Sequence, residues 1–247
     1  MLYITMNRVD LSNRTIWLTG ASRGIGRAIA ENLASTNANL VLSSSNKDSI
    51  KDLVTQFSSF PNIIFFPFDL SNYNEIKNTY SRISSFFGKV DILINNAGIG
   101  IFKRMTDITP EEFDRSISIN FKGSYFCIQS VLPEMIKNKF GMIINISSIA
   151  ALNNFPEGTV YGASKSALTS MSNSLREEIR QFGIKVIDIL PGATETEIWS
   201  KENLINYSHR MMKPEDIADV VLSAISLNLN PRLMTELIVI KPQLGNL

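Results

Sequence analysis

Residues 15–26 read TIWLTGASRGIG: a short apolar run enters a glycine-rich turn, and a helical pattern follows directly. Glycine in such a turn permits a tight bend, close approach of the backbone to a pyrophosphate and close packing of helix on strand. The amino terminus of the following helix adds N–H donors and a positive dipole end, which favour phosphate. The stretch therefore predicts the phosphate-binding turn of a dinucleotide fold. The residues predicted to bind the cofactor here are Gly20, Ser22, Arg23, Gly24, Ile25 and Gly26.

Beyond this turn, short apolar runs alternate with helical stretches along the chain. The near-continuous hydrophobicity of the runs suits strands that are buried on both faces of a parallel sheet. Helices with proline at the first position begin at Pro110, within a capping box from Thr109, and at Pro214. The pattern predicts one α/β domain over residues 1–247, a doubly wound (Rossmann) parallel sheet with helices on both faces. The strand-like runs are Thr15–Thr19, Leu40–Ser43, Ile63–Phe68, Ile92–Asn95, Met142–Ser147, Val186–Leu190 and Leu237–Ile240.

Composition narrows the class of protein. The length of 247 residues is enough for one large core, and a hydrophobic share of 44% is ordinary for a globular protein. A net charge of +1 gives no electrostatic reason to expect nucleic acid or an anionic membrane as a partner. No apolar run approaches the roughly 18 residues of a membrane helix, and Met1–Met6 lacks the basic start of a signal peptide. We therefore expect a soluble, cytoplasmic protein.

Cysteine and histidine each occur once, which restricts the chemistry. Cys127 cannot form an intrachain disulfide, and its apolar helical setting predicts a buried structural thiol in a reducing compartment. A Ser-His-Asp site would have to include His209, and a zinc site would be short of ligands. No metal site is predicted.

The second apolar run ends in Ser43-Ser44-Ser45-Asn46. Folds that prefer NAD usually carry an acid there for the ribose 2′-hydroxyl. No acid at this place repels a 2′-phosphate, and Arg23 in the glycine turn could reach one. A charge-assisted contact worth about 1.5–3 kcal/mol corresponds to a preference of about ten- to hundredfold. We therefore expect NADP(H) to be preferred over NAD(H); the alternative is that Arg23 is only solvent-exposed and both cofactors bind.

Tyr161 and Lys165 are four residues apart and so share one face of a helix. An ammonium beside a phenol, together with a bound cation, lowers the tyrosine pKa from its usual value of about 10. Ser148 would hold the reacting oxygen by a hydrogen bond while Tyr161 gives or takes the proton. The Tyr-x-x-x-Lys pattern alone is weak, because a second copy, Tyr73 and Lys77, stands in a polar setting typical of a solvated helix face.

With these residues in place, nearly the whole chain resembles the short-chain dehydrogenase/reductase family. Any one motif is weak evidence, but the set in its order and spacing is specific. The resemblance implies an oxidoreductase that moves a hydride between NADP(H) and a small-molecule carbonyl/alcohol pair, with Tyr161 as general acid/base. The motifs are Thr19-Gly20-x-x-x-Gly24-x-Gly26, Asp69-Leu70, Asn95-Asn96-Ala97-Gly98, Asn120-x-x-Gly123, Ser148, Tyr161-x-x-x-Lys165 and Pro191-Gly192.

The resemblance also implies roles for single residues. The catalytic set would be Asn120, Ser148, Tyr161 and Lys165, in which Asn120 holds a water that links Lys165 to solvent and Lys165 also binds the nicotinamide ribose. Asp69 would accept from the adenine amino group, beside the backbone of Leu70. The remaining cofactor contacts would be Asn96, Ala97 and Gly98 on the adenosine and ribose side, and Pro191, Gly192, Thr194 and Thr196 around the nicotinamide carboxamide.

Each of these residues also has a purely structural interpretation. Asp69 and Asn120 belong to types that favour turns and caps. Asn95 and Asn96 could serve only to tie neighbouring strands, and Pro191-Gly192 is by itself an ordinary turn at the end of a strand.

Two further features concern the substrate. The irregular stretch at about residues 193–213 is of a length that usually marks a functional lid or a disordered loop, and we interpret it as a substrate lid. Phe102, Phe155, Trp199 and Tyr207 fit an apolar or aromatic ligand, and they fit core packing almost as well. The sequence identifies neither the substrate nor the physiological direction.

The family resemblance suggests a homodimer or homotetramer, paired through helices at about Pro110–Asn138 and Val160–Phe182. It also leaves two alternative functions. One is a 3-oxoacyl-[acyl-carrier-protein] reductase, although the ending Ile240–Gly245 lacks the glycine-rich segment that is common in those enzymes. The other is a non-catalytic NADP-binding sensor or scaffold on the same fold.

Overall fold

The computed structural model describes residues 9–245, so the features predicted for Met1–Met6 lie outside the described residues. Its centre is a seven-stranded sheet in the order β3-β2-β1-β4-β5-β6-β7, and every neighbouring pair runs parallel. The order reverses between β1 and β4, which is where doubly wound sheets bind ligands. The strands are β1 (Thr15–Thr19), β2 (Asn39–Ser44), β3 (Ile63–Pro67), β4 (Ile92–Asn95), β5 (Gly141–Ile146), β6 (Ile184–Pro191) and β7 (Leu237–Ile240).

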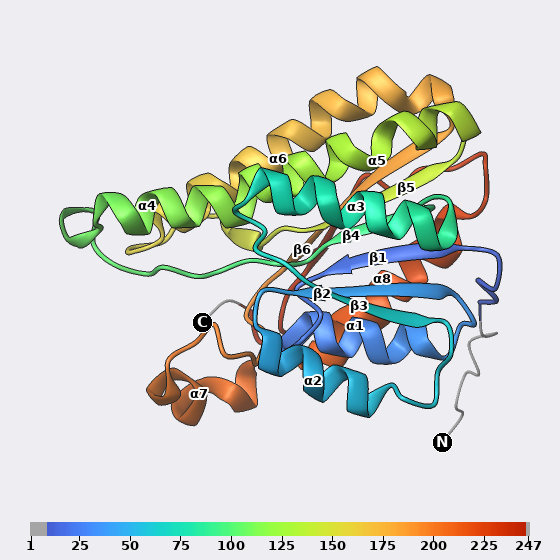
Figure 1. Ribbon diagram of the computed structural model, residues 1–247. Coiled ribbons are helices and arrows are strands. Elements are labelled where there is room, and N and C mark those ends of the chain that lie inside the picture. Colours follow the sequence, from blue (N-terminus) through green and yellow to red (C-terminus); the bar gives the residue numbers. More distant parts are fainter. Residues whose placement is uncertain (1–8, 246–247) are drawn as a thin grey trace.

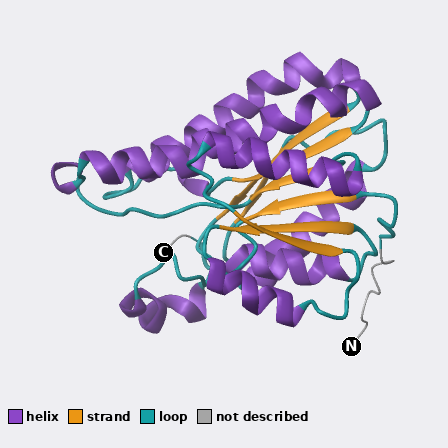
Figure 2. Ribbon diagram, in the orientation of Figure 1, coloured by secondary structure: helices purple, strands orange, loops and turns teal. Residues whose placement is uncertain are grey.

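Helices cover both faces of the sheet (Figures 1 and 2). Ile16 and Leu18 of β1 point into one apolar core, and the intervening Trp17 points into the other. Strands buried on both sides explain why the runs are apolar at every position rather than at alternate ones. The predicted doubly wound α/β fold is confirmed. One face carries α1 (Gly24–Ala34), α2 (Lys47–Gln56) and α8 (Pro214–Asn228), and the other carries α3 (Tyr73–Phe87), α5 (Ser124–Asn138) and α6 (Thr159–Ile179).

The predicted capping box begins α4 (Pro110–Ile117). The Glu112 amide donates to the Thr109 hydroxyl at 3.2 Å, and the Glu112 carboxylate accepts from the Thr109 amide at 3.1 Å. The helix expected over 110–138 is not uniform, however, because residues Ser118–Gly123 form a π-helical turn between α4 and α5. Such wide turns are frequent at functional sites. Here the turn contains the fully buried Asn120.

The stretch 193–213 is more regular than the sequence predicts. It contains α7 (Lys201–Tyr207), which begins where the Ser200 hydroxyl accepts from the Asn203 amide at 3.1 Å, and a 3-10 turn at Ser208–Arg210. Its two ends are joined, because the Glu195 amide donates to the Met212 carbonyl at 2.9 Å. The expectation of an irregular stretch was therefore wrong over α7. Figure 1 shows α4 and α7 beyond the carboxyl ends of the strands.

Among residues 9–245, no helix has both the length and the apolar character needed to cross a membrane.

Candidate active site

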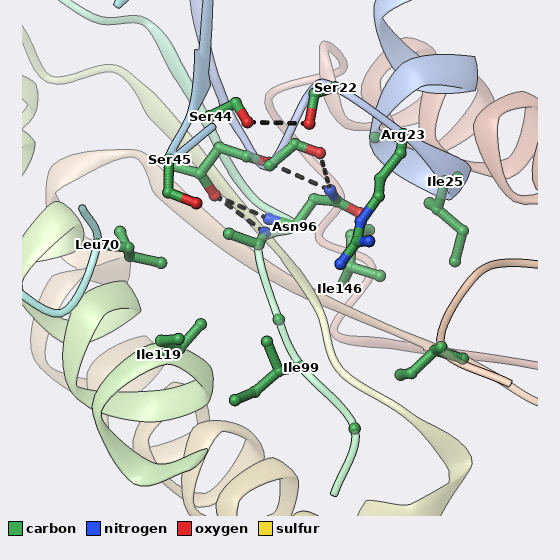
Figure 3. Close-up of a pocket in the computed structure, with 18 of the residues that line it drawn as sticks. Ser22, Arg23, Ile25, Ser44, Ser45, Leu70, Asn96, Ile99, Ile119 and Ile146 are labelled. Atoms are coloured by element: carbon green, nitrogen blue, oxygen red, sulfur yellow. Dashed lines mark hydrogen bonds between the residues drawn. The ribbon is translucent and has the colours of Figure 1, made fainter. Parts of the chain in front are cut away.

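A cavity of about 540 Å³ lies at the carboxyl ends of β1 to β5, across the point where the strand order reverses (Figure 3). Most of the residues that the sequence predicts for the cofactor line this one cavity. They are Gly20, Ser22, Arg23, Gly24, Ile25, Gly26, Asp69, Leu70, Asn96, Ala97, Gly98, Tyr161, Lys165 and Thr196.

Two glycines of the turn after β1 have no room for a side chain. A Cβ on Gly26 would lie 2.0 Å from the carbonyl oxygen of Gly20, and one on Gly20 would lie 2.7 Å from Cα of Ala97. Gly20 also has a φ of +67°, which L side chains rarely adopt. Both glycines are thus needed for the turn to fold tightly against β4 and leave open backbone beside the cavity.

The amino terminus of α1 differs from those of the next two helices. Asn46 caps α2 and Asn72 caps α3, each by accepting from two backbone amides. Arg23 at the start of α1 makes no side-chain cap, and the first turn of the helix has no acidic residue. The first amides of α1 therefore remain available for an anion, and the helix dipole favours one there. The chain fits the pyrophosphate of a dinucleotide at this place.

Hydroxyl groups gather at the end of β2. The Ser44 hydroxyl donates to the Ser22 hydroxyl at 2.9 Å, and Ser45 lines the same part of the cavity (Figure 3). Arg23 is exposed, and among residues 9–245 its guanidinium has no side-chain partner. Serine hydroxyls and a free guanidinium form a suitable environment for a phosphate group. In the sequence, Ser44 and Ser45 served only as evidence that no acidic residue ends β2. Binding of the cofactor by their hydroxyls was not predicted.

The side chains of Asn96 and Asp69 form hydrogen bonds to the backbone of neighbouring segments. The Asn96 side-chain amide donates to the carbonyl oxygens of Thr19 and Gly20, at 3.1 and 2.9 Å, and so fastens the glycine turn to the end of β4. The Asp69 carboxylate accepts from the Ser71 amide at 2.9 Å, which is the turn role named as its alternative. Asn95 ties β4 to β5 by donating to Asn145 at 2.8 Å.

Tyr161 and Lys165 occupy successive turns at the start of α6, and both line the cavity. The Lys165 ammonium nitrogen lies 5.9 Å from the centre of the Tyr161 ring. Burial raises the pKa of Tyr161, and a hydrogen bond from Ser148 opposes that rise. The sequence predicts that Lys165 and a bound cation lower the pKa of Tyr161. This prediction is wrong for the protein without a bound cation, because the protein's own groups raise that pKa. Loss of water around the buried phenol is the larger effect.

Lys165 is itself buried, and desolvation lowers its pKa to about 8. Its ammonium donates to the carbonyl oxygen of Ile146, at the end of β5, at 2.9 Å. A second bond, from the Ser147 hydroxyl to the Lys165 carbonyl at 3.2 Å, holds the helix against the same strand end. The position of the ammonium is thus fixed by β5.

Asn120 joins the segment after β4 to two helices. Its side chain accepts from the Ile99 amide at 2.8 Å and donates to the Ile99 carbonyl at 2.9 Å and to the Ser164 hydroxyl at 3.0 Å. A Cβ on Gly98 would lie 3.3 Å from the Asn120 oxygen and 3.4 Å from the Lys165 nitrogen. Asn120 and Lys165 therefore face the same glycine, although Asn120 does not line the cavity.

Four other predicted site residues also lie outside the cavity lining. Ser148 is buried beside Tyr161 and accepts from the Ala150 amide at 3.1 Å. Pro191 ends β6, the Gly192 amide donates to the Ile240 carbonyl at 2.7 Å, and the Thr194 hydroxyl donates to the Gly192 carbonyl at 3.1 Å. Pro191, Gly192 and Thr194 thus lie where β6 passes into the segment 193–213.

The cavity also has walls that the sequence did not predict. Glu112, Arg115 and Ile119 line it from one face of α4 and the π-helical turn. Their spacing of three and four residues, ending beside Asn120, is the signal that could have found them. Glu197 and Ile198 line it from the segment 193–213. Within the described part of the chain, no group of three or more His, Cys, Asp or Glu side chains could hold a metal ion.

A family model, related sequences and solved structures all relate this chain to the same group of oxidoreductases. A family model for short chain dehydrogenases matches residues 14–205. An uncharacterized oxidoreductase of Staphylococcus aureus (strain USA300) is 33% identical over 216 residues, which cover 87% of this chain and 92% of that protein.

Solved structures agree with the sequence match. A metagenomic short-chain oxidoreductase in complex with NADP has a TM-score of 0.81 at 32% identity, covering 94% of this chain and 98% of that one. ElxO with NADP bound has a TM-score of 0.84 at 26% identity, covering 93% and 97%. This chain, with its glycine turn, its parallel sheet and its Tyr161–Lys165 pair, belongs to the short-chain dehydrogenase/reductase family of oxidoreductases.

Proposed function

We propose that this oxidoreductase transfers a hydride between NADP(H) and a small-molecule carbonyl/alcohol pair, with Tyr161 as the general acid/base. One observation carries the proposal: Tyr161 and Lys165 share the wall of the cavity that begins at the glycine turn, and Ser148 is buried beside Tyr161. A dinucleotide laid from the glycine turn across the strand ends reaches this pair.

Tyr161 is in the protonated form that can donate. A phenol is protonated at neutral pH even at its ordinary pKa of about 10, and burial raises the pKa of Tyr161 further, so the hydroxyl holds a proton that it can give to a carbonyl oxygen as that oxygen gains charge. Ser148 would hold the same oxygen by a second hydrogen bond. The bound dihydronicotinamide would supply the hydride, and every other step is carried by side chains of this chain.

Lys165 would supply positive charge beside Tyr161 and bind the ribose hydroxyls of the nicotinamide nucleotide. With a pKa of about 8 it exchanges protons near physiological pH, which suits a group that helps to return a proton to Tyr161. Asn120, which faces Gly98 together with Lys165, would hold the water that continues this path.

The amino terminus of α1 and the hydroxyls at the end of β2 support NADP(H) as the preferred cofactor. Ser22, Ser44, Ser45 and Arg23 would take the 2′-phosphate, and the open amides of α1 the pyrophosphate. The NADP complexes of ElxO and of the metagenomic oxidoreductase support this assignment.

The deciding experiment compares Tyr161→Phe with Tyr73→Phe. Both variants remove one phenol hydroxyl from a Tyr-x-x-x-Lys pair, but Tyr73 lies on α3, where its ring packs edge-on against Phe126 at 4.7 Å. NADPH oxidation is followed with a panel of aldehydes, ketones, diketones, ketosteroids, sugars and 3-oxoacyl thioesters. Tyr161→Phe is expected to lose about 10²–10⁴-fold in turnover, with NADPH binding retained, whereas Tyr73→Phe matches the wild type.

Retained activity in Tyr161→Phe would remove the proposed role of Tyr161. Tight NADPH binding by the wild type without turnover of any carbonyl in the panel would favour the non-catalytic sensor instead. Turnover of 3-oxoacyl thioesters alone would favour the acyl-carrier-protein reductase.

Cofactor preference has its own matched pair of variants. Arg23→Ala is expected to weaken NADPH binding by about ten- to hundredfold, the worth of one charge-assisted contact, and to leave NADH binding unchanged. Arg27→Ala, one helical turn further on, removes an exposed arginine that pairs with Glu31 and does not line the cavity. An equal effect of Arg23→Ala on both cofactors would contradict the 2′-phosphate assignment.

Three further properties belong to the same proposal. The chain would act as one domain, and the segment 193–213 as its substrate lid, hinged where Thr194 bridges to Met212. It would work in the cytoplasm as a homodimer or homotetramer. The exposed rings of Phe113 on α4 and Tyr125 on α5 support pairing through these helices, and a sedimentation experiment that finds only monomer would contradict it.

A further inference from the structure

Three aromatic rings from three separate loops meet beside Tyr161. Phe102 follows β4, Phe155 precedes α6, and Trp199 belongs to the lid segment. Phe102 is the central ring: it lies edge-on to Tyr161 with centroids 5.1 Å apart, stacks on Trp199 at 6.2 Å and contacts Phe155 at 6.0 Å. The phenol that carries the proposed proton therefore stands directly against an aromatic cluster, made of Phe102, Phe155 and Trp199.

The backbone around the cluster is shaped to bring the rings together. A Cβ on Gly100 would lie 2.6 Å from both Phe102 and Ile198, and a Cβ on Gly158 would lie 2.6 Å from Phe155. The indole nitrogen of Trp199 donates to the Thr194 carbonyl at 3.0 Å, which fixes the ring relative to the lid hinge. The rings are thus held in place from three sides.

The cluster is not a closed core. Phe155 is 41% exposed, and Phe102 and Trp199 are only partly buried. Four of the charged groups near the rings are paired with one another, Lys103 with Glu112 and Lys213 with Glu195. Arg115 and Glu197, which line the cavity itself, carry opposite charges, so these residues offer a substrate no net charge. The rings stand just outside the cavity lining, next to Ile101 and Ile198, which belong to it, so a molecule that extends past Tyr161 in this direction meets apolar ring surface.

We infer that the substrate is a neutral carbonyl compound with a flat aromatic group attached to the carbonyl carbon, and that Phe102 selects it. This inference rests on the proposed function and names its substrate class. When a carbonyl oxygen lies on Tyr161 and Ser148, its substituent falls beside Tyr161, where the exposed part of Phe102 offers ring contact. Ring contacts in stacked or edge-on geometry add about three- to tenfold in binding beyond the buried area, and a saturated ring forgoes that gain.

The test uses two ketones of similar size and different shape, acetophenone and cyclohexyl methyl ketone, with 4-acetylbenzoate as a charged analogue. The enzyme is saturated with NADPH. We expect Phe102→Leu to lower kcat/KM for acetophenone by about three- to tenfold, chiefly through KM, and to change cyclohexyl methyl ketone less than twofold. The different intrinsic reactivities of the two carbonyls cancel when each variant is divided by the wild type. The charged analogue should be the poorest substrate of the three.

Phe86→Leu is the matched control, because Phe86 is an exposed ring on α3 that contacts Phe66 at 6.3 Å and does not belong to the aromatic cluster beside Tyr161. NADPH binding shows that each variant is folded. An equal loss on both ketones in Phe102→Leu would mean that the cluster only closes the lid, and would overturn the inference. Preference of the wild type for 3-oxoacyl thioesters or sugars would also overturn it while the proposed function stands. Turnover of no carbonyl would overturn both.

Discussion

The ammonium nitrogen of Lys165 lies 2.9 Å from the carbonyl oxygen of Ile146, inside a cavity wall from which water is largely excluded. One backbone carbonyl replaces the water shell only in part, and this loss of water lowers the pKa of Lys165 to about 8. The folded protein therefore binds the Lys165 proton less tightly than the unfolded chain does, for which the pKa is about 10.4.

This relation predicts how stability changes with pH. Between about pH 8 and 10.4 the unfolded chain keeps a proton that the folded protein has lost, so the contribution of Lys165 to the free energy of unfolding rises with pH. Below about pH 8 the burial cost is present in full. Urea unfolding of the wild type and Lys165→Met at pH 7.5, 8.5 and 9.5 measures the difference. The advantage of Lys165→Met should be largest at pH 7.5 and shrink as the pH rises, and a constant difference would contradict the lowered pKa.

Asn120 gives a second prediction, on the segment that forms one wall of the cavity. Its side chain makes the hydrogen bonds of Ile99 on both the amide and the carbonyl side. Asn120→Leu leaves these backbone groups without a buried partner, which costs about 1–3 kcal/mol for each unsatisfied group. We expect lower thermal stability and weaker NADPH binding together. Asn120→Asp should lose less stability below the pKa of the new carboxyl, because the neutral acid can accept from the Ile99 amide and donate to the Ile99 carbonyl, whereas the ionised form only accepts and buries a charge. Full stability in Asn120→Leu would show that water replaces these bonds.

Gly26 gives a third prediction, on the turn after β1. A methyl group at this position would stand 2.0 Å from the Gly20 carbonyl oxygen and 2.4 Å from the Asn96 side-chain nitrogen, so the turn must open. We expect Gly26→Ala to lose about 1–3 kcal/mol of stability and to bind NADPH at least tenfold more weakly, as measured by unfolding and by fluorescence titration.

Gly88→Ala is the control for this change. Gly88 has a φ of +78° but open space around the added methyl, so alanine there costs only the backbone strain of about 1–2 kcal/mol. Cofactor binding should be unaffected. Equal loss of NADPH binding in both variants would point to general destabilisation rather than to the turn.

Some elements of the fold could be predicted from the sequence and others could not. The strands at Thr15–Thr19, Ile92–Asn95 and Leu237–Ile240 have the predicted bounds because an apolar run bounded by polar residues is a local signal. The glycine turn could be predicted for the same reason, because its glycines are a local signal. The sequence does not predict the π-helical turn, because the four-residue apolar spacing of Phe113, Ile117 and Phe121 continues through it as it would in an α-helix.

The burial of individual side chains could not be predicted from the sequence. The pKa of Tyr161 depends on how much water surrounds the phenol, and neither its neighbour Lys165 nor its spacing reports that. The walls formed by Glu112 and Arg115 depend on which face of α4 turns toward the cavity. Ion pairs between residues on different elements could not be predicted either, because no local pattern indicates that Arg176 and Asp188 pair.

The last prediction concerns that pair. The Arg176 guanidinium donates to the Asp188 carboxylate at 2.8 Å, with the two side chains 3% and 0% exposed. Asp188 of β6 also accepts from Ser172 at 2.7 Å and from Asn145 of β5 at 3.1 Å. Burial raises the pKa of Asp188, and these bonds with the charge of Arg176 oppose the rise. Arg176→Met removes the opposing charge, and breaking a buried pair from one side costs about 3–5 kcal/mol.

The double variant Arg176→Met with Asp188→Asn should regain much of this loss, because a neutral amide can still accept from Ser172 and Asn145. The deficit of Arg176→Met should also shrink as the pH falls from 7 toward 5. Without Arg176 the folded pKa of Asp188 rises further above its unfolded value, and protonation then removes the buried charge. Urea unfolding of the wild type, the single variant and the double variant at both pH values measures these differences. If Arg176→Met lost less than 1 kcal/mol at pH 7, or if its deficit grew at pH 5, the carboxylate would not depend on Arg176 for its charge.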